Sequence, residues 1–180
     1  MTERQENILA IALRLFAQQG YDSTPTSQIA KEAGVSEGLI FRHFQNKEGL
    51  LQAIMEDGQD RISAYVDEII VETDPKKRLS LAIDLCPRLI REEYAFWSLQ
   101  FTLKFRSTQF ASLKHQHAGT IRLLQAGVEA FSALGYKSPV QETQLLLLLL
   151  EGLTAHLLVS SENNDVSEII QFIKLKYNVD

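Results

Sequence analysis

Cysteine is almost absent from this chain, which holds one thiol, Cys86, in 180 residues. A single cysteine excludes an intrachain disulfide and is typical of proteins that work in a reducing compartment. The amino-terminal residues MTERQEN are charged and run directly into a helical pattern, so no signal peptide is predicted. We therefore expect a cytoplasmic protein.

Long apolar runs are missing as well. The longest consists of the six leucines at 145–150, and Glu151 and His156 follow it closely. A helix that spans a membrane needs about 20 predominantly apolar residues. The helix that contains this run is therefore predicted to be buried in protein, and no membrane partner is expected. With 45% apolar residues, the chain has enough material for a sizeable core.

Sequence patterns of catalysis and metal binding are also lacking. The chain has no glycine-rich phosphate loop and no G-x-S-x-G motif. His115 and His117 are two residues apart, which puts them on nearly opposite sides of a helix, whereas paired metal ligands on a helix are separated by three or four. We therefore predict no catalytic residues, no metal site and no cofactor, and an enzyme built on a helical bundle stays only as a third alternative.

Positive charge is the last feature in short supply. The net charge is −5, and residues 1–50 carry five basic against six acidic side chains, hence a net charge of −1. Nucleic-acid binding through a broadly basic surface is thus excluded. If the chain binds DNA, the affinity must come from a few well-placed cations, from backbone N–H groups and from the amino termini of helices.

What the chain does contain is a series of helical patterns with no alternating strand pattern. The prolines at 25, 75 and 139 follow a threonine, an aspartate and a serine, and each pair marks the start of a helix. Pro87 is expected to kink or divide the helix that contains it. The fold class is predicted to be all-α, with helices at 3–19, 25–32, 37–44, 47–72, 75–91, 93–106, 108–134, 139–160 and 165–177.

Residues 20–51 give the most specific pattern. Thr24 is expected to cap a first short helix, and Gly34 to end it in the left-handed conformation. Ala30, Gly34 and Ile40 have the spacing of a helix-turn-helix, in which the small alanine lets the two helices cross closely. Such a unit places its second helix in the major groove of DNA.

This stretch closely resembles the amino-terminal domain of TetR-family transcriptional regulators. The match covers roughly the first 50 residues, and beyond them only a helical architecture agrees. The resemblance implies a helix-turn-helix DNA-binding domain at 1–46 and a larger helical domain for effector binding and dimerisation at 47–180. One departure is Phe41, where many members carry a tyrosine whose hydroxyl could reach a phosphate. The matching residues are Gly20, Thr24, Ile29, Ala30, Ala33, Gly34, Val35, Ser36, Gly38, Phe41, His43, Phe44, Lys47, Glu48, Leu50 and Leu51.

Ten residues are candidates for contacts with DNA. Arg42 is the best reader of sequence, because a guanidinium can donate two hydrogen bonds to guanine O6 and N7. Glu37 either accepts from cytosine N4 or only offsets the positive end of its helix. Phe41 either meets a thymine methyl group or packs on the scaffold, and the resemblance implies phosphate contacts for His43 and Lys47. The full set is Thr24, Ser27, Ser36, Glu37, Gly38, Leu39, Phe41, Arg42, His43 and Lys47.

A stripe of aromatic residues follows in the middle of the chain. Trp97, Phe101 and Phe105 recur at every fourth position, and Tyr94 precedes them. The resemblance implies a small-molecule pocket among the middle helices, which these four residues would line. The alternative is an ordinary core. A pocket of this composition predicts a largely apolar effector.

The helix predicted at 139–160 is apolar almost all round, which calls for burial on more than one side. Small residues in it and in the preceding helix would let another backbone approach. The pattern alone leaves open an ordinary core helix of a monomer, whereas the resemblance implies a four-helix dimer bundle. The predicted interface residues are Gly119, Leu123, Ala126, Ala130, Leu145, Leu148, Gly152, Ala155 and Val159.

Together these features predict a homodimeric transcriptional regulator that acts as a repressor. It would bind a palindromic operator in double-stranded DNA and release it when a small molecule binds. The alternative from a different class is a helical small-molecule-binding or interaction module without DNA binding, which the acidic balance and Phe41 leave open.

Overall fold

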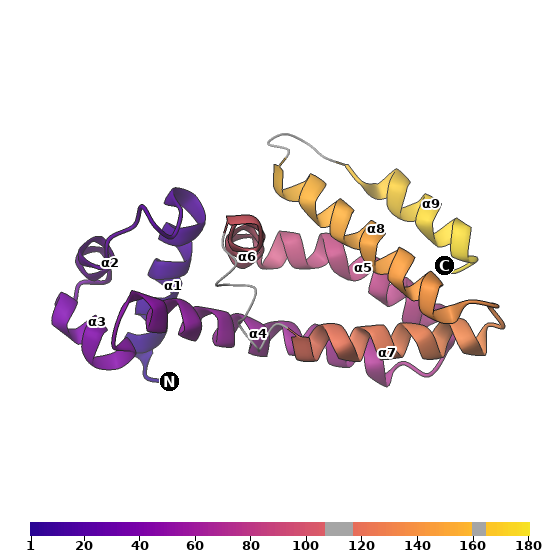
Figure 1. The fold of residues 1–180 in the computed structure, drawn as a ribbon, viewed down its shortest axis with the longest axis horizontal. Helices are drawn as coiled ribbons and strands as arrows, with labels where there is room; N and C mark the ends of the chain where they lie inside the picture. The colour runs from indigo at the N-terminus through magenta and orange to yellow at the C-terminus, as the bar shows by residue number, and fades with distance from the viewer. Residues whose placement is uncertain (107–116, 160–164) are drawn as a thin grey trace. The chain divides into compact units, whose positions relative to one another are not determined.

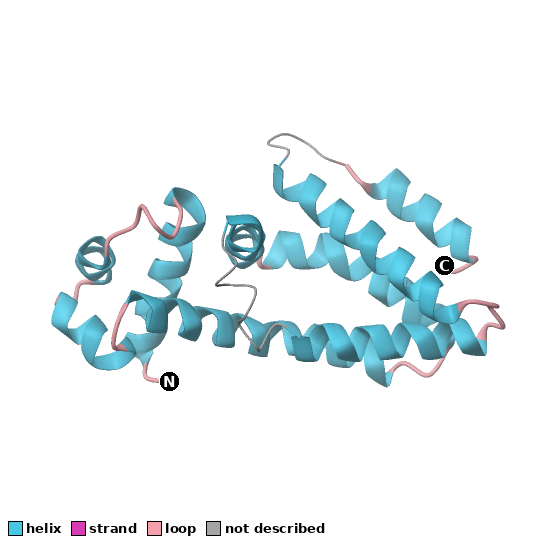
Figure 2. Cartoon of the chain, viewed as in Figure 1, coloured by secondary structure: helices cyan, strands magenta, loops and turns pink. Residues whose placement is uncertain are grey.

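The computed structural model describes residues 1–106, 117–159 and 165–180. Figure 1 traces the helices in chain order, and Figure 2 shows that the regular structure of these ranges is entirely helical. The all-α fold class is therefore confirmed. The helices are α1 Glu3–Gln19, α2 Thr26–Ala33, α3 Glu37–Phe44, α4 Lys47–Val71, α5 Pro75–Glu92, α6 Tyr94–Arg106, α7 His117–Ala133, α8 Pro139–Val159 and α9 Ser167–Tyr177.

The helix bounds agree closely with those predicted from the sequence. α1 and α3 begin and end at the predicted residues, and every other helix end within the described ranges lies within two positions of the predicted one. The predicted start of the seventh helix, at 108, lies outside the described residues. α5 continues through Pro87, so of the two expected outcomes the division of this helix is wrong and the kink stays a prediction.

The described chain forms two compact units, of which the first comprises residues 1–60 and 95–106. In this unit α1, α2 and α3 bury their apolar sides against one another, because the apolar residues of each helix recur on one face. Burying an aliphatic or aromatic side chain of this kind stabilises the fold by about 1.5–3 kcal/mol. The side chains that form this core include Ile8, Ala12, Leu15, Phe16, Ile29, Ile40 and Phe44.

α6 belongs to the first unit, where it packs on the part of α4 that precedes residue 61. Phe96 is fully buried, and its ring comes within 2.0 Å of the position that a Cβ on Gly58 would occupy. The ring can rest directly on the backbone of α4 because Gly58 has no side chain. Leu99 and Leu103 continue the buried side of α6.

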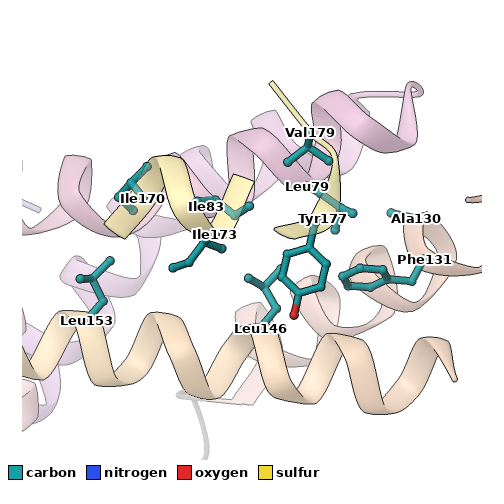
Figure 3. Close-up of a cluster of buried hydrophobic side chains, with 10 residues drawn as sticks. All are labelled: Leu79, Ile83, Ala130, Phe131, Leu146, Leu153, Ile170, Ile173, Tyr177 and Val179. Carbon is teal, nitrogen blue, oxygen red and sulfur yellow. The ribbon is translucent and has the colours of Figure 1, made fainter. Parts of the chain in front are cut away.

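The second unit comprises the remaining described residues, and its core lies where α5, α7, α8 and α9 contribute side chains (Figure 3). Phe131 meets Tyr136 and Tyr177 edge-on, with ring centroids 5.0 Å and 5.2 Å apart, a favourable geometry for aromatic rings. Gly127 lets α8 approach α7, since a Cβ there would lie 2.6 Å from Thr143. The buried cluster is Leu79, Ile83, Ala130, Phe131, Leu146, Leu153, Ile170, Ile173, Tyr177 and Val179.

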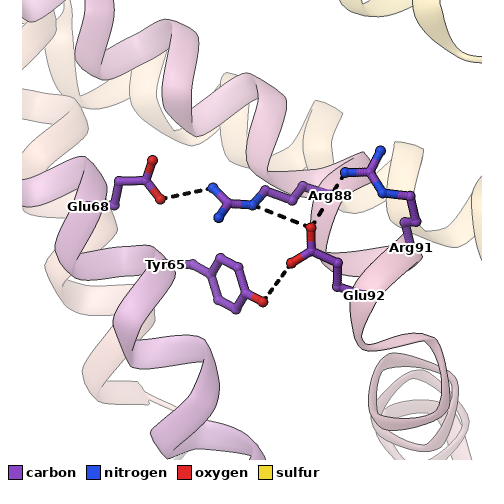
Figure 4. Close-up of polar contacts among 5 residues, drawn as sticks. All are labelled: Tyr65, Glu68, Arg88, Arg91 and Glu92. Carbon is purple, nitrogen blue, oxygen red and sulfur yellow. Dashed lines mark hydrogen bonds and ion pairs between the residues drawn. The ribbon is translucent and has the colours of Figure 1, made fainter.

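A group of polar side chains joins the end of α4 to the end of α5 (Figure 4). Arg88 donates to Glu68 at 2.9 Å and lies over the ring of Tyr65, 4.8 Å from its centroid. The hydroxyl of Tyr65 donates to Glu92 at 2.8 Å, and this hydrogen bond lowers the pKa of Glu92. A single surface ion pair adds about 0–1 kcal/mol, so these contacts orient the two helices more than they stabilise them.

α8 is the one helix of the described ranges that is long and apolar enough to span a membrane by length and composition. Within the chain, however, α8 is buried on one side only. Thr143, Leu146 and Leu153 face the core, whereas Leu145 and Leu148 are 43% and 65% exposed. The prediction that this helix is buried on more than one side is therefore not met by a single copy of the chain.

Replacing Gly58 with alanine is expected to lower the free energy of unfolding by about 1–3 kcal/mol, because the added methyl group would overlap the buried ring of Phe96. Urea unfolding measures the loss. The matched control is Gly38→Ala in α3, where no atom lies within 4 Å of the added Cβ and where the helix propensity of alanine adds up to about 1 kcal/mol. Equal effects in both variants would contradict the contact between α6 and α4.

Tyr177→Phe is expected to make the second unit more resistant to alkali. Burial raises the pKa of Tyr177 to about 12, so the folded chain holds the phenol proton more tightly than the unfolded chain. The contribution of the protonated Tyr177 phenol to the free energy of unfolding is fully present below pH 10 and is lost as the pH rises towards 12. Because phenylalanine cannot ionise, its variant should lose less stability over this range in unfolding measurements.

The same variant is expected to be neutral or slightly stabilising at pH 7, because the buried Tyr177 hydroxyl has no hydrogen-bond partner among the described residues. The control is Tyr136→Phe. The Tyr136 hydroxyl donates to the Tyr177 carbonyl at 3.4 Å, so its loss should cost about 0.5–1.5 kcal/mol at pH 7. If the free energy of unfolding fell equally steeply above pH 10 in Tyr177→Phe and in the unmodified protein, the attribution of this pH dependence to Tyr177 would be refuted.

Candidate nucleic-acid interface

The turn between α2 and α3 is set by its backbone. Gly34 follows α2 with φ at 67°, the left-handed conformation that favours glycine, and the N–H of Val35 donates to the Ala30 carbonyl at 3.0 Å. Ser36 occupies the N-cap position of α3, although its side chain makes no capping hydrogen bond. α3 then begins at Glu37, so the structure has the helix-turn-helix that the spacing predicts.

α3 has a buried side and an open side. Ile40 is fully buried and Phe44 nearly so, and these two residues anchor the helix. On the open side Arg42 is exposed, and Phe41 is 41% exposed, which is high for so large an apolar ring. A Cβ at Gly38 would have nothing within 4 Å. A ligand can therefore come close to the backbone of the first turn.

Glu37 is held by the protein at the start of α3. Its Oε1 accepts a hydrogen bond of 2.5 Å from the hydroxyl of Thr26, which links the first turn of α3 to the first turn of α2. Hydrogen bonds to a carboxylate are among the stronger kinds. The contact gives Glu37 a role in fixing α3, and its recognition of a base stays a prediction.

Lys47 lies at the start of α4 and contacts the segment that follows α1. Its Nζ donates to the Asp22 carbonyl at 3.3 Å and lies 4.6 Å from the centre of the Tyr21 ring and 5.8 Å from that of Phe16. Partial burial lowers the pKa of the Lys47 amine. The residue is therefore a structural link within the first unit as well as a candidate for a phosphate contact.

Thr24 is fully buried, and this removes it from the set of residues that could touch DNA. Its hydroxyl donates to the Gly20 carbonyl at 2.8 Å, which holds the turn after α1. Thr24 is not the cap of α2 either, because Pro25 occupies the N-cap position. Among the other candidates, Ser27 and Ser36 are exposed and Leu39 is partly buried.

His43 is partly buried on α3, where α1 supports it. Nε2 of Gln5 lies 3.5 Å from Nδ1 of the imidazole, and the ring of Phe44 meets it at a centroid distance of 6.1 Å. Gln5 was not among the predicted site residues. Nothing in the sequence distinguishes Gln5 from an ordinary surface glutamine. Its position next to α3 becomes visible only in the folded chain.

The aromatic residues predicted to line a pocket are divided between the two units. Tyr94 is 53% exposed and belongs to the second unit, whereas Trp97 and Phe101 belong to the first and are partly buried. The side chain of Phe105 lies outside the described part of the chain. The Nε1–H group of Trp97 is buried without an acceptor among the described residues, so it could donate to a ligand. The pocket itself stays a prediction.

The residues predicted for a dimer interface differ in how exposed they are on the folded chain. Ala126 and Ala130 are buried inside the chain, so they are not on the surface of a folded subunit. Gly119, Leu123 and Ala155 are partly buried, and Leu145, Leu148, Gly152 and Val159 are exposed on α8.

α9 carries exposed apolar side chains that were not predicted. Ile169, Phe172 and Leu175 are 46%, 64% and 75% exposed, at a spacing of three residues that keeps them towards one side of the helix. The opposite side of α9 contributes to the same core as α8. We call the exposed residues Leu145, Leu148, Val159, Ile169, Phe172 and Leu175 the outer apolar face.

Comparison with known proteins gives the motif its context. Residues 8–54 match the family described as bacterial regulatory proteins, tetR family. The HTH-type transcriptional regulator HbdR of Aromatoleum sp. (strain CIB) is 29% identical over 143 residues, which is 78% of this chain and 62% of that protein. The HTH-type transcriptional regulator YuxN of Bacillus subtilis (strain 168) is 31% identical over 157 residues, 86% of this chain and 53% of that protein. The chain thus spans less than two thirds of the length of these curated relatives.

A solved structure agrees over nearly the whole chain. The crystal structure of AibR in complex with isovaleryl coenzyme A and operator DNA is similar with a TM-score of 0.72, at 21% identity and with 96% of each chain covered. At this identity the likeness concerns the fold. The match to the tetR family of bacterial regulatory proteins thus covers residues 8–54, and the curated relatives and the solved structure are similar to the chain beyond that stretch.

Proposed function

We propose that this chain is a DNA-binding transcriptional regulator, a repressor in type, that acts as a homodimer and leaves its operator when a small molecule binds. The observation that carries the proposal is the open side of α3, where Phe41 and Arg42 project from a helix anchored by Ile40 and Phe44. Relatives named as HTH-type transcriptional regulators support it. The proposal includes no catalytic step, and it places the protein in the cytoplasm.

The open side of α3 has groups suited to the major groove. The guanidinium of Arg42 can donate to guanine O6 and N7 together, which discriminates against other bases by about 1–3 kcal/mol. Phe41 offers an apolar surface to a thymine methyl group, and Gly38 lets the helix backbone lie close to a base edge. Sequence preference would therefore depend on Arg42 more than on any other residue of the set.

Phosphate contacts would be few. The first 50 residues have a net charge of −1, and the amine of Lys47 is already engaged with Asp22 and Tyr21. Each phosphate neutralised by a cation steepens the salt dependence of binding by a slope of about 0.9. A low count of such contacts implies modest affinity for unrelated DNA and a shallow dependence on salt.

The outer apolar face supports a homodimer. Single exposed apolar residues are common on proteins, but a group of them on two helices that share a core is typical of an interface. Gly152 lies on the exposed side of α8, where a Cβ would meet nothing within 4 Å, so a second helix backbone could come close. A symmetric dimer would offer two α3 helices to half-sites about 34 Å apart, one turn of DNA.

Release of DNA by an effector follows from linkage. A small molecule shifts the protein towards a conformation that does not fit the operator only by its difference in affinity for the two conformations. The partly buried Trp97 and Phe101 favour a largely apolar effector, and the buried Nε1–H of Trp97 favours one with a hydrogen-bond acceptor. The solved structure of AibR in complex with isovaleryl coenzyme A and operator DNA supports the proposal that a protein of this fold binds both a small molecule and DNA.

The DNA contacts can be tested on a duplex selected from random sequences and on its scrambled counterpart. Arg42→Ala is expected to weaken binding to the selected duplex by roughly 5–150-fold and to affect the scrambled one much less. Lys47→Met should weaken both to a similar degree and also lower the melting temperature, because the contacts to Asp22 and Tyr21 are lost. Fluorescence anisotropy at several salt concentrations measures both effects.

The matched charge control for these variants is Lys76→Ala, an exposed lysine at the start of α5. It should leave both affinities unchanged. Equal losses on the two duplexes for Arg42→Ala would refute its role as a reader. If the unmodified protein bound no duplex at low salt, the proposed function itself would be wrong.

The dimer has its own test. Leu148→Glu puts a charge in the outer apolar face and is expected to give a monomer at micromolar concentration in sedimentation velocity. Val71→Glu is the matched control, because Val71 is an apolar residue that is 74% exposed and belongs to α4, not to α8 or α9. It should leave the protein dimeric. A monomeric unmodified protein, or a Leu148→Glu variant that remains dimeric, would contradict the proposed interface.

A further inference from the structure

Gln5, in the first turn of α1, uses the two ends of its amide for two different partners. Its Oε1 accepts from the backbone N–H of Thr2 at 2.9 Å and from the Thr2 hydroxyl at 3.1 Å. Its Nε2 lies 3.5 Å from Nδ1 of His43. One side chain thereby connects the capping box of α1 to α3.

The orientation of this amide follows from what each group can do. A backbone N–H only donates, so the amide atom that faces Thr2 must be the oxygen. The NH₂ group is then turned towards His43, and since an amide NH₂ also only donates, Nδ1 must accept. An imidazole whose Nδ1 accepts is neutral and carries its proton on Nε2.

We propose that Gln5 holds His43 as the Nε2–H tautomer and so presents Nε2 as a hydrogen-bond donor to a phosphate oxygen of DNA. Nε2 has no protein partner among the described residues, and the edge-on contact with Phe44 steadies the ring. The inference deepens the proposed function and rests on it, because the phosphate belongs to the DNA that α3 would bind. Gln5 is then a positioning residue that acts through His43.

The chemistry of the opposite tautomer shows why this control matters. With the proton on Nδ1, Nε2 would carry a lone pair, and a lone pair facing a phosphate oxygen is repelled. A neutral donor also gives this unit a phosphate contact that needs no positive charge, which suits the acidic balance of residues 1–50. The capping box of α1 would therefore help to set DNA affinity although it belongs to neither α2 nor α3.

The tautomer can be measured on the free protein, without DNA, from the nitrogen-15 shifts of the His43 ring at about pH 8–9. In the unmodified protein Nδ1 is expected to be of the unprotonated type and Nε2 of the protonated type. Gln5→Glu keeps an oxygen for the capping box but offers His43 only acceptors, so Nδ1 should become protonated. A protonated Nδ1 in the unmodified protein would overturn the proposal.

The consequence for DNA is measured by a double-mutant cycle. Gln5→Met keeps the length of the side chain but removes its donor, and it is expected to weaken binding of selected and scrambled duplexes alike by roughly 2–10-fold. In a His43→Ala background the same change should have no further effect. Gln18→Met is the control, since Gln18 is exposed on the same helix, and it should leave binding unchanged.

Thermal melting of each variant separates a loss of folding from a loss of binding. Additive losses in the cycle would overturn the proposal, because they would show that Gln5 does not act through His43. Failure of the proposed function looks different: the unmodified protein would then bind no duplex, whatever the state of the His43 ring. A protonated Nδ1 in a protein that does bind DNA would refute the role of Gln5 alone.

Discussion

The open side of α3 depends on one packing constraint, the burial of Ile40 and Phe44 beneath this helix. α3 has only eight residues, and a helix of two turns is not stable by itself in water. Its existence and its rotation about its own axis both come from the core of α1 and α2. That core leaves Phe41 and Arg42 on the outside, so the apolar side of the helix determines which residues are available for the proposed contact with DNA.

Local chemistry was sufficient to predict most of the fold. The capping residues, the prolines and the glycine at 34 placed the helices, because each of them acts within one turn of the chain. Roles that depend on distant partners were beyond such patterns. Thr24 looked like a cap but is buried against the turn at Gly20, and the bond between Thr26 and Glu37 joins two helices.

The second unit shows the same limit. A small residue on a helix marks a close approach, but the sequence does not tell whether the neighbour is in the same chain. Ala126 and Ala130 proved to be internal, whereas Phe172 and Leu175, in a short helix of mixed composition, are exposed. The aromatic stripe was ambiguous for a related reason, since it was Phe96, next to the stripe and not part of it, that became fully buried.

The placement of α6 has a consequence for signalling. The chain leaves the first unit after Asp60 and returns to it at Ala95, and the ring of Phe96 then rests on the bare backbone of Gly58. Any molecule that binds α6 is therefore in direct contact with the same folded unit that contains α3. A displacement of α6 would reach α4 through the contact between the Phe96 ring and the Gly58 backbone. Because this contact is tight, α6 could shift little without moving α4.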